Sequence, residues 1–192
     1  MPNYCSNVVT LRHTDPAMIQ RVVRGYTGKG LMTEFYPIPD KLVDTMAGSY
    51  GADDPRQAEL EQRERDNLAE FGHKNWYDWA VANWGTKWDV TQENNGDAGV
   101  SDDGLEVQIS FDSAWSPPVK FYEEMEQQGF TVDAFYYESG LAFCGRYTDG
   151  VDDYYDIEGN SSWVDDNIPA DINEVFAISE SMSMWEEEES EN

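Results

Sequence analysis

The alternation of hydrophobic and polar positions predicts strands separated by amphipathic helices. Residues 6–12 (SNVVTLR) alternate and are rich in β-branched residues, with Val9 and Leu11 on one face, as is typical of a strand. A Thr-Asp-Pro helix start at 14–16 opens a helix that continues to about residue 25. The same patterns predict later strands at 89–93, 104–111, 130–137, 140–147 and 152–157, and later helices at 55–71, 76–84, 118–128 and 169–176.

In chain order these elements give the βαββαβ pattern of ferredoxin-like folds, with strands added at its end. We therefore expect an α+β protein with a ferredoxin-like sheet that carries its helices on one face. The helices at 55–71 and 76–84 belong to an α-helical insertion, at about residues 31–87, between the first helix and the second strand. Residues 1–178 are expected to form one domain, and the glutamate-rich residues 179–192 an acidic flexible tail.

Residues 76–89 (WYDWAVANWGTKWD) carry four of the seven tryptophans. Helical spacing puts Trp76 and Trp79 on one face of a short helix, and Gly85 suits a left-handed helix end. Large buried aromatic side chains dominate core energetics, so packing is favoured over a ligand cage as the role of these rings. The predicted structural core includes Trp76, Trp79, Trp84, Trp88 and Trp115.

Composition places the chain among folded proteins. With 192 residues, 14% of them aromatic, it is long and aromatic enough to bury a core. It has no run of about 18 apolar residues and no secretory signal, so we expect a cytoplasmic protein. Cys5 and Cys144 are too few for a disulfide framework and are expected to be buried thiols.

The charge is distributed unevenly along the chain. The formal net charge is −27, and residues 89–192 hold 27 of the 39 acidic residues but only two basic ones, Lys120 and Arg146. This imbalance argues against nucleic acid or anionic lipid as the partner of that part of the chain. It favours a basic protein surface, a cation, or no role beyond solubility.

Four short motifs resemble a known family. They are MPNYCSN at the start, WYDW followed by NWGTKWD, AWSPP, and YYESGLAFCGRY, and together they span about residues 1–180. In these motifs the chain resembles the YubB-like proteins of phages and conjugative plasmids, whose ferredoxin-like domain has no assigned function. Tyr4 stands where that family is expected to carry tryptophan. The resemblance implies a fold and a mobile-element context, and it implies no activity.

No motif for catalysis or cofactor binding accompanies these features. The sequence has no G-x-S-x-G, no P-loop and no Gly-rich dinucleotide fingerprint, and its two cysteines cannot ligate an iron–sulfur cluster. An EF-hand aligned on Gly96 fails at its first and third ligand positions, where Thr91 and Glu93 stand. We therefore expect a protein without enzymatic activity, cofactor or metal. Minor alternatives are an acid–base pair among the many carboxylates, or a cation held by Asp149, Asp152, Asp153, Asp156 and Glu158.

Dense carboxylates on rigid elements suit a protein that imitates the charge of DNA. The hypothesis is a phage or plasmid protein that binds and inhibits a host DNA-binding or defence protein in the bacterial cytoplasm, as anti-restriction and anti-CRISPR proteins do. Its partner would be a basic protein surface, with no direct contact to nucleic acid or membrane. The alternative is a non-mimic interaction or structural protein of the mobile element. The candidate carboxylates form three groups: Asp102, Asp103 and Glu106; Glu123, Glu124 and Glu126; Asp149, Asp152, Asp153 and Asp156.

Overall fold

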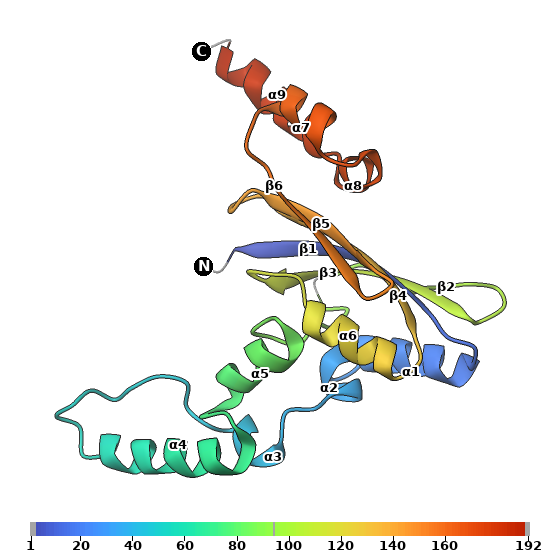
Figure 1. Cartoon of the computed structure of the whole chain (residues 1–192). Helices are drawn as coiled ribbons and strands as arrows, with labels where there is room; N and C mark the ends of the chain where they lie inside the picture. The colour runs from blue at the N-terminus through green and yellow to red at the C-terminus, as the bar shows by residue number, and fades with distance from the viewer. Residues whose placement is uncertain (1–2, 94, 191–192) are drawn as a thin grey trace.

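The computed structural model describes residues 3–93 and 95–190, and Figure 1 shows the arrangement of their helices and strands. None of the described helices is long and apolar enough to cross a bilayer. The strands are β1 (Tyr4–Arg12), β2 (Gly99–Val100), β3 (Glu106–Ala114), β4 (Thr131–Glu138), β5 (Phe143–Thr148) and β6 (Val151–Asp156). The helices are α1 (Pro16–Thr27), α2 (Leu31–Phe35), α3 (Asp40–Val43), α4 (Gln57–Phe71), α5 (Trp76–Trp84), α6 (Val119–Gln127), α7 (Ser161–Asn167), α8 (Ala170–Phe176) and α9 (Ile178–Ser190).

Within the described residues, six strands form one open antiparallel sheet in the order β2-β3-β1-β4-β5-β6. β1 lies in the middle, so Val9 faces Ile109 on one side and Ala134 on the other. The connection from β1 to β2 contains α1–α5, and α6 connects β3 to β4. The chain is therefore an α+β protein, and the strands predicted at 104–111, 130–137, 140–147 and 152–157 are confirmed with small shifts of their ends.

The main core lies on the face of the sheet covered by α1, α2, α5 and α6. Alternation along β1 buries Val9 and Leu11 on this face. The tryptophan helix begins and ends as predicted, and its Asn75 side chain accepts a hydrogen bond from the Asp78 amide at 3.0 Å. Because Trp79 and Trp84 then face inward, one helix ties residues 31–43 to the layer under the sheet.

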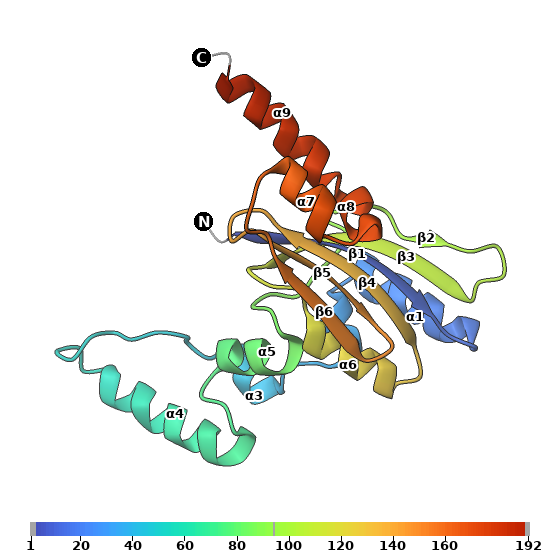
Figure 2. The same cartoon turned by 45° about the horizontal axis from the view of Figure 1, so that its top comes forward.

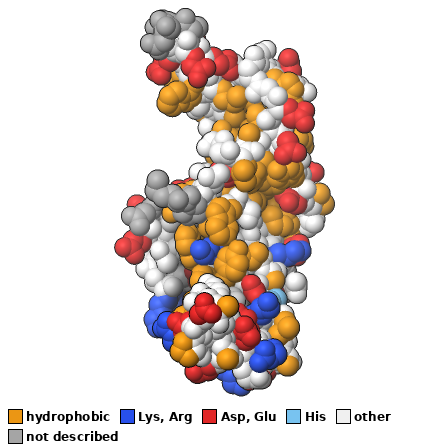
Figure 3. All heavy atoms as spheres, turned by 90° about the vertical axis from the view of Figure 1, so that its left-hand side faces the viewer, with side chains coloured by type: hydrophobic (Ala, Val, Ile, Leu, Met, Phe, Trp, Pro, Cys, Tyr) orange, Lys and Arg blue, Asp and Glu red, His pale blue; other side chains and the backbone are white. Residues whose placement is uncertain are grey.

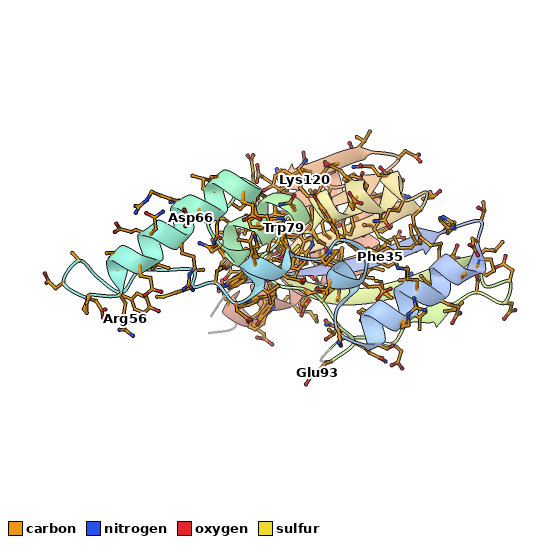
Figure 4. The ribbon with its side chains drawn as sticks, turned by 90° about the horizontal axis from the view of Figure 1, so that it is seen from below. Phe35, Arg56, Asp66, Trp79, Glu93 and Lys120 are labelled. Atoms are coloured by element: carbon orange, nitrogen blue, oxygen red, sulfur yellow. The ribbon has the colours of Figure 1, made fainter. Side chains whose placement is uncertain are left out.

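The helix α4 stands apart from this layer, as the sequence predicts for a solvated insertion. Only Leu60 and Asn67 are buried among its fifteen residues. Figure 4, which views the molecule from below, shows Phe35 and Trp79 within the body, Asp66 on the projecting α4 and Arg56 just before its start.

The opposite face of the sheet is also covered, by α7, α8 and α9. Their apolar side chains, including Val164 and Ile172, pack on Phe135, Tyr137 and Cys144 of β4 and β5. Figures 1 and 2 show these three helices on the far side of the sheet from α1 and α6. The expectation of helices on one face only is therefore wrong. Residues 151–156 add β6 to the edge, and the chain after β6 crosses to the second face.

Residues 89–93, predicted as the second strand, do not join the sheet. Their backbone is used elsewhere: the Val90 carbonyl accepts from the Leu31 amide at 2.9 Å, and the Gln92 amide donates to Tyr26 at 2.7 Å. The Asp89 carboxylate accepts from the amides of Met32 and Thr33, both at 2.8 Å, and so caps the start of α2. The apolar pattern read as a strand is a connecting segment with Val90 buried, and the second strand of the chain is the short β2.

Residues 178–190 form the helix α9 in place of the predicted flexible tail. Ile178 is buried and Met182 packs beside it against α7 and α8. The Glu186 carboxylate accepts from both the amide and the hydroxyl of Ser161, each at 2.8 Å, at the start of α7. A helical stripe of apolar residues inside the glutamate-rich sequence therefore orders this segment.

Candidate functional site

The strand β6 exposes a row of aspartates along one edge of the sheet. Among the described strands it pairs only with β5, in a register that sets Tyr147 opposite Asp152 and Arg146 opposite Asp153. The preceding turn places Asp149 and Gly150 at φ 50° and 75°, the positive values of a type I′ hairpin turn. Asp149, Asp152, Asp153 and Asp156 are all exposed.

Tyr136 holds Asp152 in place. Its hydroxyl donates to Asp152 Oδ1 at 2.6 Å. To reach that carboxylate the ring crosses Gly145, where a Cβ would lie 2.2 Å from the Tyr136 hydroxyl oxygen. Burial, and then the hydrogen bond to Asp152, raise the pKa of Tyr136 far above its ordinary value, so the hydroxyl remains a donor at neutral pH. Asp152 is thus oriented by a neutral group.

Glu126 links α6 to the same edge. It accepts from the Tyr147 hydroxyl at 2.7 Å and from the Gly150 amide at 3.1 Å. Burial, and then the neighbouring Glu126, raise the pKa of Tyr147, to which the charges of Glu123 and Asp152 also contribute. Two candidate groups therefore meet here. We call Glu123, Glu126, Asp149, Asp152, Asp153 and Asp156 the β6 acidic surface, in which Asp153, opposite Arg146, projects from the other face of the sheet.

The third candidate group lies elsewhere. Asp102, Asp103 and Glu106 lie at the connection between β2 and β3, and β1 and β4 separate β3 from β5. Glu106 is paired with Arg12 at 2.6 Å, and Asp103 accepts from the Ser101 hydroxyl at 2.7 Å. That hydrogen bond is the main reason why the pKa of Asp103 is lowered. The three predicted groups do not form one face.

Glu124 also points away from the β6 acidic surface. Gln128 donates to Glu124 at 2.9 Å and to the Phe35 carbonyl at 3.2 Å, which places this side of α6 toward α2. Glu124 is a neighbour of Glu123 and Glu126 in the sequence, but it lies on a different side of α6 and does not belong to the β6 acidic surface.

The described part of the chain offers neither a metal site nor a reactive cysteine. Across residues 3–93 and 95–190, no three His, Cys, Asp or Glu side chains are arranged as a metal site. Both cysteines are buried free thiols, as predicted. Burial raises the pKa of Cys144 to about 11 and that of Cys5 further, so neither is a thiolate at neutral pH.

The prediction that all five tryptophans belong to the core is wrong for two of them. Trp79 and Trp84 are buried, and Trp76 is half-buried. Trp88 and Trp115 are 41% and 37% exposed. Trp88 lies outside the core because residues 86–93 run over the surface and do not join the sheet. Trp115 lies outside it because the chain turns away at the end of β3, where Trp115 has a φ of 67°.

These exposed rings surround a lysine. Lys87 Nζ lies 4.5 Å from the ring centroid of Trp88, 5.2 Å from that of Trp115 and 5.7 Å from that of Tyr77. The neighbouring hollow, of about 470 Å³, is lined by Trp76, Tyr77, Lys87 and Trp115 together with Asn75 and Asp78. We call Trp76, Tyr77, Lys87, Trp88 and Trp115 the aromatic groove. The sequence signal for this groove is a lysine, Lys87, between two tryptophans, although the aromatic pattern predicts that these rings belong to the core.

The chain has a weak structural similarity to a solved protein. No family model and no curated protein matches it. Among solved structures, the crystal structure of protein api92 from Yersinia pseudotuberculosis, assigned to the family DUF1281, is similar. The sequence identity is 10%, the match covers 83% of this chain and 99% of that chain, and the TM-score is 0.37. A similarity at this level carries no argument about function.

Proposed function

We propose that this chain binds and inhibits a bacterial DNA-binding or defence protein by presenting the β6 acidic surface to its basic, DNA-binding face. The observation that carries the proposal is the way in which these carboxylates are held. Glu126 and Asp152 accept from tyrosine hydroxyls, so their orientation is fixed while their charge is kept. Both cations of residues 89–192 are already paired: Lys120 with Glu123, and Arg146 with Asp133 and Asp171.

The charge density of this surface is close to that of one DNA strand. The six residues of β6 span about 20 Å at 3.3 Å per residue. Because Lys120 pairs with Glu123, five uncompensated carboxylates remain along that length. They give one charge per about 4 Å, whereas DNA carries one per about 3.4 Å of each strand. A protein surface built to bind a phosphate backbone would therefore meet a similar field here.

We further infer that β2-β3-β1-β4 with α1 and α6 is a ferredoxin-like unit to which β5 and β6 are added. The strand order and the two helix-containing connections support this inference. With the four sequence motifs, it favours the YubB-like family and its mobile-element setting, in which an inhibitor of host defence is useful. The chain would then act in the cytoplasm of a bacterial host, as a binding protein and not as an enzyme.

A non-mimic interaction protein is the second candidate function. The aromatic groove supports it, because exposed tryptophans around a lysine are typical of binding surfaces. Four of the five groove residues lie within residues 1–88, which have little net charge, so binding in the groove would depend weakly on salt.

The test captures partners from a bacterial lysate at about 0.1 M and 0.5 M NaCl and then measures the affinity of the identified partner. Reversal of Asp149, Asp153 and Asp156 to Lys is expected to weaken binding at least tenfold and to flatten its salt dependence, since charge pairs across an interface are screened by salt. The matched control reverses Asp53, Glu61 and Asp66, which are exposed and lie in or beside α4, and changes the net charge equally. Unchanged affinity and salt dependence in the β6 variant would end the mimic proposal.

A further inference from the structure

The aromatic groove contains a cation with no carboxylate partner among the described residues. Lys87 is half-buried and contacts three ring faces, and no salt bridge involving it is present in the described part of the chain. Asp78 lines the same hollow but forms no salt bridge with Lys87. Cation–π contacts hold an ammonium in place without neutralising its charge. The groove is therefore suited to a segment that brings both a carboxylate and an apolar side chain.

Backbone strain supports a binding role for the same groove. Trp115 has a φ of 67°, in the left-handed region that a bulky side chain rarely adopts. Its amide donates to the Asn3 carbonyl at 3.0 Å, which helps to hold this conformation. The strain does not bury the ring, since Trp115 stays 37% exposed. Strained residues that display an exposed side chain are concentrated at binding sites.

The end of α9 has the complementary character. Ile178 and Met182 pack on α7 and α8, and Trp185 continues their helical stripe, but it is 69% exposed. Met184 beside it is 56% exposed, and the run Glu186–Glu189 follows. Near its end, α9 therefore exposes the apolar side chain of Trp185 next to a run of glutamates.

We propose that two copies of this chain associate by placing the end of α9 of each copy in the aromatic groove of the other. Charge favours this pairing, because residues 1–88 have a net charge of only −2, whereas any contact between the acidic parts of two copies is repulsive. Trp185 packs on the exposed rings, and a carboxylate of the glutamate run approaches Lys87. Figure 3 views the molecule from the side toward which α4 projects, with the end of α9 at the top, and hydrophobic side chains gather between these two ends. Two such contacts related by a two-fold axis form a closed dimer.

The first experiment measures self-association of the full chain by sedimentation at about 0.15 M NaCl, where repulsion between distant charges is largely screened. A concentration-dependent monomer–dimer equilibrium is expected. Trp185→Ala and Lys87→Glu should each weaken the dimer at least tenfold. The matched controls are Leu141→Ala, a removal of an equally exposed apolar side chain at 64%, and Lys29→Glu, an equal change of charge at an exposed site. Both controls should dimerise as the wild type does.

The second experiment mixes the two variants. A mixed dimer of Lys87→Glu with Trp185→Ala retains one intact groove facing one intact α9, and both substitutions fall in its other contact. Because a contact that has lost one partner loses little more with the second, the mixture should associate more tightly than either variant alone. Wild-type protein that stays monomeric up to about 1 mM overturns the proposal, and so does a mixture that shows no such recovery. An association unaffected by both substitutions assigns the dimer to another surface and equally overturns it. Circular dichroism confirms that each variant is folded.

Discussion

The two parts of the chain hold their carboxylates in different ways. Residues 1–88 carry ten basic and twelve acidic residues, and several of these acids meet cations, as when Arg21 contacts Glu34 at 2.9 Å and Lys41 contacts Glu70 at 2.6 Å. In residues 89–192, tyrosine hydroxyls donate to Glu126, Asp152 and Asp156 at 2.7, 2.6 and 2.9 Å. A cation cancels the field of a carboxylate, whereas a hydroxyl orients the carboxylate and leaves its field intact.

The carboxylates contribute little to the stability of the fold in either part of the chain. Exposed ion pairs contribute only about 0–1 kcal/mol each, so the pairs of residues 1–88 explain little of the stability. Apolar burial under the sheet, with Trp79 and Trp84 at its edge, is the main stabilising term there. The β6 acidic surface adds repulsion, which the rest of the fold must offset.

The largest expected effect is on the core of the first part. Trp84→Ala should lower the free energy of unfolding by about 3–5 kcal/mol, because Trp84 is 2% exposed and its indole N–H donates to the Tyr36 carbonyl at 2.8 Å. Urea denaturation measures the change. Trp88→Ala, at a site 41% exposed, is the control and should cost under about 1 kcal/mol. Equal losses in the two variants would contradict the division between core and groove.

Alkaline pH should weaken the second part. Burial raises the pKa of Tyr122, Tyr136 and Tyr147 above the ordinary 10.0. Their contribution to stability is therefore complete below pH 10 and is lost as the pH rises toward the folded-state values, because only the unfolded chain then releases these protons. Each should cost about 1 kcal/mol per pH unit above 10, or about 3 kcal/mol together at pH 11. Tyr147→Phe should reduce the measured loss by about 1 kcal/mol in denaturation curves at pH 9 and 11, and an unchanged loss would contradict the assignment.

Gly145→Ala tests the hydrogen bond between the Tyr136 hydroxyl and Asp152. The added methyl would lie 2.2 Å from the Tyr136 hydroxyl oxygen and 2.5 Å from the Asp153 carbonyl oxygen. The ring must move, at a cost of about 1–3 kcal/mol, and Asp152 loses its donor. Thermal unfolding measures the cost. Gly99→Ala in β2 is the control, since its methyl meets only an ordinary contact at 3.8 Å. If Gly145→Ala is as stable as that control, the Tyr136 ring does not depend on the space above Gly145 to reach Asp152.

Much of the fold follows from local pattern. Local pattern locates β1, β3, β4 and β5, of which the first three alternate between buried and less buried positions, and helical spacing locates α1, α5 and α6. The pattern failed at residues 89–93, where Val90 is buried without a strand partner and Asp89 caps a helix 57 residues away from it in sequence. Local pattern also does not predict α9. Its few apolar positions stand in a glutamate-rich segment, and the sequence does not show that α7 and α8 pack against them.

The candidate site was predictable only in part. Composition identified the acidic region, and two of its three groups do meet beside Tyr147. Their meeting depends on the position of α6 across the sheet, which no local pattern records. The aromatic groove was missed because a tryptophan has the same sequence signal whether it is buried, like Trp84, or displayed, like Trp115.

The smallest expected effect separates two explanations of the β6 aspartates. An exposed edge strand pairs with other chains unless charge or shape prevents it, so these aspartates can act simply as a guard against aggregation. Asp153→Asn with Asp156→Asn removes two edge charges at exposed sites, and should change the free energy of unfolding by less than about 1 kcal/mol. If the β6 acidic surface binds a basic partner, this variant stays soluble at high concentration and loses affinity and salt dependence toward that partner. A guard function predicts the reverse, namely aggregation seen by light scattering with unchanged affinity.

Asp102→Asn with Asp97→Asn is the matched control, because it removes the same charge at exposed sites outside β6 and should change neither property.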